Sequence, residues 1–162
     1  HEQTRSDALV EEYIDGRELY VGVLGNERLT ALPAWEIDFG TLSQVQSGIA
    51  TRKVKWDPAY QAKHGIATGP ARDLSPAQQE GLSKLAKRIY RALHMSGYAR
   101  MDLRLRADGS LFVLEANANP NLTFGEDFAE SAEAVGISYE TLLTRIVSLG
   151  LAYRPEWRLF ES

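Results

Sequence analysis

The sequence predicts an α+β fold in which an antiparallel β-sheet packs with helices. Three observations predict it: an alternating apolar pattern between positions 19 and 39, a strongly capped helix that begins at Ser75, and a hairpin pattern over residues 100–117. The length of 162 residues is typical of one domain, so we expect residues 1–162 to form a single domain.

Composition narrows the classes of function. Apolar residues make up 44% of the chain, but no apolar run approaches the ~20 residues of a membrane helix, so we expect no membrane partner. The net charge of −4 argues against a nucleic-acid partner, because surfaces that bind nucleic acid are normally strongly basic. The chain has no cysteine, which excludes a disulfide framework and fits the reducing cytoplasm, where we expect the protein.

The first part of the chain is predicted to form strands, over residues 9–32. Apolar residues at 19, 21 and 23 alternate with their neighbours, and Gly25-Asn26 provides a hairpin turn. Arg28–Leu32 is then the return strand, and apolar residues at 35, 37 and 39 continue the two-residue period. Residues 40–74 lack a strong period and are rich in turn formers, so we predict a long, partly ordered loop region there.

Ser75 begins the most clearly predicted helix. Ser75 can cap it, Pro76 suits the first helical position, and Gln78 completes a capping box. We expect the helix to end before Gly97. Its apolar stripe consists of Leu82, Leu85, Ala86, Ile89 and Leu93. Two shorter helices are predicted over about residues 126–135 and 138–149.

Residues 100–117 predict a β-hairpin with Asp108-Gly109 as a two-residue turn, since both residues tolerate positive φ. The turn sets a register in which apolar pairs face the core. These pairs are Met101 with Ala116, Leu103 with Leu114, and Leu105 with Phe112. On the second face, the same register places Asp102 opposite Glu115 and Arg100 opposite Asn117.

Asp102 and Glu115 would repel each other as opposed carboxylates with Cβ atoms about 5 Å apart. A proton shared between them, the charge of the neighbouring arginine, or a divalent cation would compensate. Together with Asn117, the two acids offer an all-oxygen ligand set of the kind that Mg²⁺ prefers. The alternative is a surface strand with scattered charges that include Arg104 and Arg106.

The hairpin resembles the signature of ATP-grasp carboxylate–amine ligases, in particular the D-alanine–D-alanine ligases. The matching residues are Arg100-Met101-Asp102, Leu114-Glu115-Ala116-Asn117 and Asn119-Pro120. The resemblance implies the fold of an ATP-grasp C-terminal subdomain. It also implies that Asp102, Glu115 and Asn117 hold the Mg²⁺ ions (Mn²⁺ being an alternative) that bridge the phosphates of ATP. Arg100 would neutralise charge on the transferring phosphoryl group or the tetrahedral intermediate.

Residues 9–18 are similar to the segment of these ligases that binds adenine and ribose. The resemblance implies nucleotide contacts for Glu11, Glu12, Tyr13, Ile14 and Glu18. Backbone groups of Glu12 and Ile14 would bind the adenine edge, and the Glu18 carboxylate would accept hydrogen bonds from the ribose hydroxyls. The alternative for this segment is an amphipathic edge strand.

Lys55-Trp56 is similar to the lysine–aromatic pair on the mobile loop that covers the nucleotide in this family. The resemblance implies that Lys55 places a positive charge on the phosphates. The alternative is an ordinary exposed loop lysine.

The resemblance extends over roughly residues 9–150 and implies an ATP-dependent ligase that joins a carboxylate to an amine through an acylphosphate. Its substrates would be small molecules or peptides. The alternative from another class is a non-catalytic nucleotide-binding or regulatory module. In this family the N-terminal substrate domain and a glycine-rich loop precede the adenine-binding segment. We therefore expect the chain to be the C-terminal part of a ligase and inactive alone, with a homodimer as one allowed assembly.

Asn121 is a departure from the family pattern, because the D-alanine ligases usually have Gly there. In those ligases the Gly amide helps to hold the oxyanion, and Asn tolerates left-handed conformations better than most residues. The departure leaves open whether the product is D-alanyl-D-alanine.

Overall fold

The structure is a computed structural model that describes residue 7, residues 9–44 and residues 48–154. The strands are β1 (Arg17–Leu24), β2 (Thr30–Ala31), β3 (Trp35–Asp38), β4 (Ala67–Pro70), β5 (Tyr98–Leu105) and β6 (Leu111–Asn117). The helices are the 3₁₀ helix η1 (Gly40–Gln44), α1 (Arg52–Trp56), α2 (Pro58–His64), α3 (Pro76–Ala92), α4 (Asp127–Glu133) and α5 (Tyr139–Ala152). The sheet order is β4-β3-β1-β5-β6, β2 pairs with β1, and all pairs are antiparallel, which confirms the predicted fold class.

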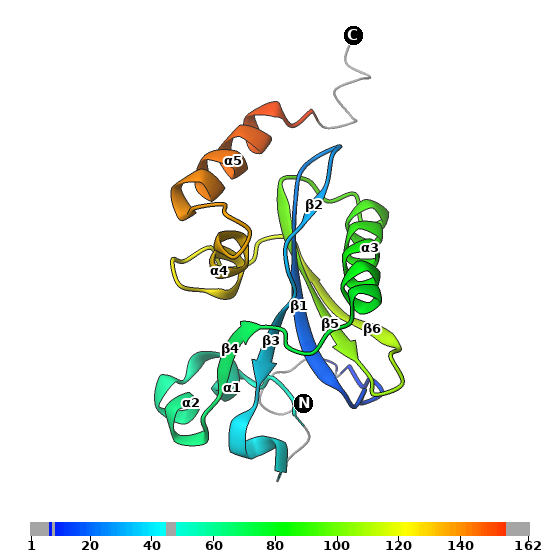
Figure 1. Ribbon diagram of the computed structural model, residues 1–162, viewed down its shortest axis with the longest axis vertical. Coiled ribbons are helices and arrows are strands. Elements are labelled where there is room, and N and C mark those ends of the chain that lie inside the picture. Colours follow the sequence, from blue (N-terminus) through cyan, green and yellow to red (C-terminus); the bar gives the residue numbers. More distant parts are fainter. Residues whose placement is uncertain (1–6, 8, 45–47, 155–162) are drawn as a thin grey trace.

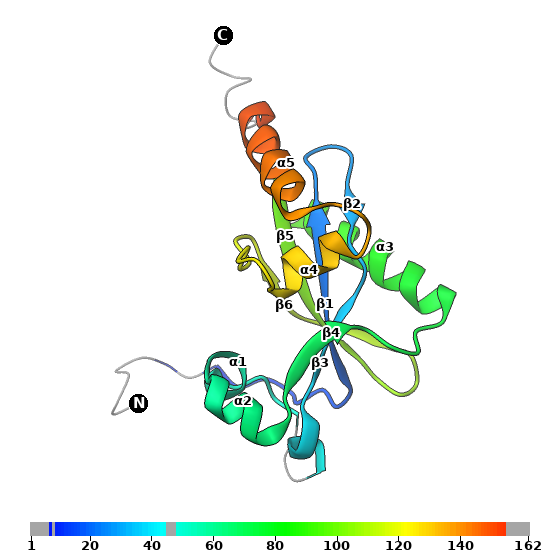
Figure 2. The same cartoon turned by 60° about the vertical axis from the view of Figure 1, so that its left-hand side comes forward.

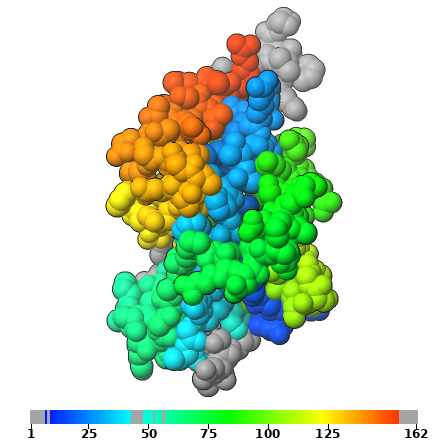
Figure 3. Space-filling model, viewed as in Figure 1, coloured from blue at the N-terminus to red at the C-terminus, as the bar shows by residue number. Residues whose placement is uncertain are grey.

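Helices cover the sheet from two sides (Figures 1 and 2). On one face, buried residues of α3 pack on alternate residues of β1 and β5, among them Leu19, Val21, Met101 and Leu103. α4 and α5 lie on the opposite side and form a second cluster around Phe128. A third cluster joins β1 and β3 to η1 and α1. In the space-filling view, α4 and α5 form an upper lobe, and β3, η1, α1, α2 and β4 form a lower one (Figure 3).

The predicted capping box at the start of α3 is confirmed: the Ser75 hydroxyl accepts from the Gln78 N–H, and the Gln78 side chain accepts from the Ser75 N–H. The helix ends at Ala92, earlier than predicted, and His94 then takes a positive φ of 51°. Leu93 consequently leaves the apolar stripe and is 54% exposed. The last core position belongs to Tyr90, whose hydroxyl donates to the Gly25 carbonyl at 2.7 Å.

The prediction of strands over residues 9–32 was partly wrong. Residues 9–15 form no strand, because both edges of β1 are occupied by β3 and β5 and the segment finds no partner among the described residues. The return strand shrinks to Thr30–Ala31, since the connecting turn has five residues rather than two. In that turn, the Gly25 N–H donates to the Gly97 carbonyl, which ties the turn to the start of β5.

Residues 40–74 were wrongly predicted as a loop region. In their described part they contain η1, α1, α2 and β4. The two α-helices are too short to show a helical period, and local capping marks their starts instead. Thr51 accepts from the Val54 N–H, and Asp57, followed by Pro58, accepts from the Tyr60 N–H.

The hairpin forms, and its predicted register is right only in the half farther from the turn, from Arg100 to Asp102. Arg106 pairs with Ser110 around a three-residue turn, one residue longer than predicted, so Leu103 faces Val113 and Leu105 faces Leu111. A β-bulge between Asp102 and Leu103 then takes up one extra residue on β6. The two one-residue shifts cancel. Consequently Met101 faces Ala116, Asp102 faces Glu115 and Arg100 faces Asn117 as predicted, whereas Leu114 is 45% exposed instead of facing the core.

Candidate functional site

The sheet face opposite α3, which we call the site face, carries a charged row along β1 and β5. Tyr20 lies opposite Asp102 and Glu18 lies opposite Arg104. Because side chains alternate along a strand, these residues share one face, whereas their apolar neighbours belong to the α3 core. Asp102 is only 2% exposed and Arg104 only 3%, so this is a buried polar surface and Arg104 is no scattered surface charge.

Arg100 is the main partner of Asp102. Its Nε and Nη2 atoms donate to the two carboxylate oxygens at 2.8 and 2.9 Å. Lys55 approaches the same carboxylate, with its Nζ atom 3.9 Å from Oδ2. Burial opposes the charge on Arg100, but the hydrogen bonds to Asp102 prevail and its pKa lies above the usual value. Of the three compensating features expected for the paired acids, the structure contains the arginine.

Glu115 and Asn117 extend the site face onto β6. The Glu115 side chain is exposed and forms no hydrogen bond or ion pair with any described residue. The Asn117 Oδ1 atom accepts from the Asn119 N–H at 2.9 Å. The described residues contain no group of three or more His, Cys, Asp or Glu side chains that would hold a metal. The candidate donors are therefore two carboxylates and one amide oxygen on facing strands, which fits a hard cation that keeps several waters.

The segment expected to bind adenine has no regular secondary structure over residues 9–15. Glu11, Glu12 and Tyr13 are exposed and Ile14 is half-buried. The Glu12 Oε1 atom lies 3.5 Å from Arg106 Nη2. The backbone groups of Glu12 and Ile14 form no hydrogen bond with other described residues, so they remain able to bind a ligand edge.

Glu18 belongs to a buried network rather than to the exposed segment before it. It is 3% exposed, and its two oxygens accept from the Tyr20 hydroxyl at 3.0 Å and from Arg104 Nη2 at 2.9 Å. Burial and the neighbouring carboxylates raise the pKa of Tyr20 well above its usual value, so its hydroxyl stays a donor. Two lone pairs of the carboxylate remain after these contacts.

Lys55 is positioned by the two short helices of the lower lobe. The Gln61 side-chain amide on α2 donates to the carbonyls of Val54 and Lys55 at 2.8 and 3.3 Å, which clamps the end of α1. The Trp56 side chain, predicted as the partner of Lys55, lies outside the described part of the structure. Sequence reasoning missed the role of Gln61, although the Asp57-Pro58 helix start was a signal for α2.

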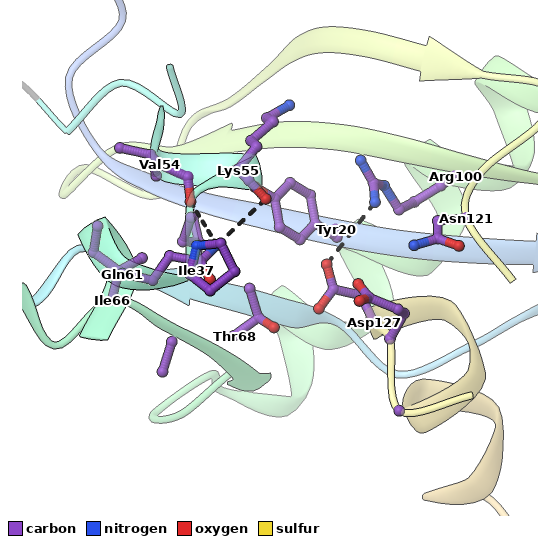
Figure 4. Close-up of a pocket in the computed structure, with 14 residues that line it drawn as sticks. Tyr20, Ile37, Val54, Lys55, Gln61, Ile66, Thr68, Arg100, Asn121 and Asp127 are labelled. Carbon is purple, nitrogen blue, oxygen red and sulfur yellow. Dashed lines mark hydrogen bonds and ion pairs between the residues drawn. The ribbon is translucent and has the colours of Figure 1, made fainter. Parts of the chain in front are cut away.

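A pocket of about 350 Å³ lies between the lower lobe and the start of α4. Its lining includes the basic residues Lys55 and Arg100 and the acidic residues Glu126 and Asp127. Arg100 lies beside Asp127 (Figure 4), with its Nη1 atom 3.9 Å from Asp127 Oδ2. The remaining lining residues include Tyr20, Gln61, Thr68 and Asn121. Sequence reasoning assigned no role to Tyr20 or Asp127, since Tyr20 looked like one more strand residue and Asp127 like an acid that starts a helix.

Asn121 does not use the left-handed conformation that it tolerates, since the described non-glycine residues with positive φ are Asp73 and His94. Its Oδ1 atom instead accepts from the backbone N–H and the hydroxyl of Thr123, at 3.0 and 2.7 Å.

None of the described helices is both long and apolar enough to cross a membrane.

Comparison with known proteins agrees with this architecture. The family model for the D-Ala–D-Ala ligase C-terminus matches residues 2–148. The uncharacterized protein y4sG of Sinorhizobium fredii is 35% identical over 147 residues, which cover 88% of this chain and 40% of that protein. A D-alanine–D-alanine ligase of Pelotomaculum thermopropionicum is 35% identical over 144 residues, covering 89% of this chain and 42% of the ligase.

Solved structures show the same fold. The D-alanine–D-alanine ligase of Bacillus anthracis complexed with ATP matches with a TM-score of 0.65 and 26% identity, over 87% of this chain and 40% of that one. This chain thus spans about two fifths of the length of the curated relatives that it matches. Because the family model covers nearly all of its residues, the chain belongs to the D-Ala–D-Ala ligase family and corresponds to the C-terminal region of these proteins.

Proposed function

We propose that the protein is an ATP-dependent ligase that joins a carboxylate to an amine, with this chain as the C-terminal part of its ATP-grasp domain. The observation that carries the proposal is the convergence of Lys55, Arg100 and Asp102 beside the exposed Glu115 on one sheet face. The positive side chains of Lys55 and Arg100, together with the oxygen ligands of the acids, suit a nucleoside triphosphate that binds with divalent metal ions. The B. anthracis relative, whose structure contains ATP, supports the choice of nucleotide.

The site residues divide into metal ligands and nucleotide contacts. Asp102, Glu115 and Asn117 would hold Mg²⁺, which when bound neutralises phosphate charge and orients the transferring group. Lys55 would add a positive charge at the phosphates. Glu18 would bind the ribose hydroxyls.

Adenine would be bound by the exposed segment before β1. The backbone groups of Glu12 and Ile14, which bind no other described residue, would supply donors and acceptors for its edge, with Glu11 and Tyr13 as neighbouring exposed residues. This assignment gives a role to a segment that forms no strand.

Arg100 is the residue that we assign to the chemistry itself. In such a ligase the substrate carboxylate attacks the γ-phosphorus, ADP leaves, and the amine then displaces phosphate from the acylphosphate. Negative charge develops first on the transferring phosphoryl group and then on the tetrahedral carbon's oxygen. The Arg100 guanidinium, which is fixed by Asp102 and lines the pocket, would offset both charges.

The pocket beside Arg100 would receive the two substrates, which we assign only as a carboxylate and an amine of small molecules or peptides. Relatives are longer than this chain, so a substrate domain and further phosphate contacts would come from the rest of the protein. Because the reaction consumes ATP, we place it in the cytoplasm.

Replacing Glu115 with Gln in the complete protein tests the proposal. The Glu115 side chain is exposed and forms no hydrogen bond or ion pair with described residues, so the fold should persist while Mg²⁺-dependent ADP binding weakens by about tenfold or more and ATP turnover is mostly lost. Glu130→Gln is the matched control, since Glu130 is an acid in the first turn of α4 that does not line the pocket. Equal Mg²⁺ affinity in all three proteins would overturn the metal assignment. Binding of Mg-ADP without turnover of any carboxylate would favour the non-catalytic module.

A further inference from the structure

Arg104 is a buried charge that the proposed reaction does not use. It lies on β5 and is only 3% exposed. A buried guanidinium is costly unless its donors are paired, so its surroundings must supply several acceptors. The contacts of Arg104 therefore indicate what it is there to hold.

Three acceptors on two segments of the chain receive hydrogen bonds from the Arg104 guanidinium. The Nη2 atom donates to Glu18 Oε2 at 2.9 Å, and the Nη1 atom donates to the Gly16 carbonyl at 2.7 Å. Nη2 also donates to the Gly48 carbonyl. The rings of Tyr13 and Phe39 lie 5.9 and 6.0 Å from the guanidinium carbon.

Two of these acceptors belong to the part of the chain assigned above to the nucleotide, and the third precedes the helix that carries Lys55. Gly16 ends the irregular segment proposed to bind adenine, and Glu18 is the proposed ribose ligand. Gly48 precedes α1, which carries Lys55, and residues 48–51 have no regular secondary structure. The segment before β1 and the segment before α1 are thus tied to one side chain of β5.

We infer that Arg104 is a positioning residue, which fixes the Glu18 carboxylate and holds the 9–16 and 48–51 segments against the sheet so that they meet the nucleotide together. The inference rests on the proposed function. Arginine suits this task because its planar fork presents donors in several fixed directions, whereas the single ammonium of lysine cannot span three acceptors of this spread.

The test compares binding of Mg-ADP and Mg-2′-deoxy-ADP by the complete protein, measured calorimetrically. If the Glu18 carboxylate binds the ribose 2′-hydroxyl, the wild type should bind ADP about tenfold more tightly than its 2′-deoxy analogue. In Arg104→Met, ADP should bind at least tenfold more weakly and its preference over the analogue should fall below about threefold. Arg104→Lys keeps the buried charge, so it protects the fold while the preference still falls.

Arg17→Met is the matched control. Arg17 neighbours Glu18 in sequence, but its side chain donates to Glu36 and to the Arg72 carbonyl and not to the 9–16 or 48–51 segment. It should retain the wild-type preference even where it lowers the unfolding temperature. A role of Arg104 in stability alone would leave the preference unchanged in the folded Arg104 variants, which overturns the inference. A wild type that binds ADP without preferring it to the analogue also overturns it. A wild type that binds no Mg-ADP at all refutes the proposed function instead.

Discussion

Replacing Arg100 with Met removes the positive charge that compensates Asp102. The stability of the variant should therefore depend on a bound cation. Asp102 is 2% exposed and receives two hydrogen bonds from Arg100. Removing one partner of a buried ion pair costs about 3–5 kcal/mol. Lys55, with its Nζ atom 3.9 Å from Asp102, compensates in part, so we expect the lower end, about 3 kcal/mol. For a chain of this size the unfolding temperature would fall by roughly 6–12 °C.

Thermal unfolding with and without MgCl₂ is the assay. If Asp102 and Glu115 form the cation site, Mg²⁺ replaces the lost charge, and at about 100 times its Kd it restores about 2.7 kcal/mol. Arg17→Met serves as the control, because its partner Glu36 is more exposed, at 21%, and this pair should contribute at most about 1 kcal/mol and respond no more than the wild type to Mg²⁺. Unfolding of Arg100→Met at the wild-type temperature would refute the pairing argument. Absence of any stabilisation of Arg100→Met by Mg²⁺ would refute the cation site.

Three further predictions concern stability. Gly22→Ala should cost about 1–3 kcal/mol in chemical denaturation, because the new Cβ would lie 2.8 Å from Leu32 Cδ1 and 2.9 Å from Phe128 Cε2; an unchanged midpoint would contradict it. Tyr90→Phe leaves the Gly25 carbonyl without its donor, and a loss of about 1–3 kcal/mol is expected in the same assay. Burial raises the pKa of Tyr90 to about 12, above the value near 10 in unfolded chains. The stabilisation by the Tyr90 hydroxyl is therefore complete below about pH 10 and disappears as the pH rises to about 12. Denaturation curves across this range should show a smaller alkaline loss for Tyr90→Phe.

Residues whose role depends on near neighbours were predictable from the sequence. Ser75 and Gln78 cap α3 within one turn, and the period-two pattern of β1 follows from local alternation. The opposition of Asp102 and Glu115 was also predicted correctly, although through two errors that cancel. Val113 and Leu114 are both apolar, so the pattern cannot indicate which of them is the extra residue.

Residues whose role depends on distant partners were not predictable. Arg104 looks like a surface charge until Glu18, 86 residues away, is placed beside it. α1 and α2 have five and seven residues, too few for a hydrophobic period, so only their caps mark them. Asp127 is typical of a helix start, and only the fold brings it to Arg100. The site is therefore assembled mainly by contacts between segments that are far apart in sequence.

The three-residue turn and the β-bulge of the β5–β6 hairpin also determine which insertions and deletions the hairpin can accept. Residues of the tip, between Leu103 and Val113, lie beyond the bulge, so a change of loop length at Asp108 can be absorbed there without moving the acids. Deleting Leu114 alone leaves no spare residue. With it gone, the Asp102–Glu115 and Leu103–Val113 pairs follow each other in a regular ladder, whereas deleting Ala116 would turn Asn117 to the α3 side of the sheet. Length variation among natural forms of this hairpin should therefore be confined to the tip and the bulge, while the spacing from Glu115 to Asn117 stays fixed.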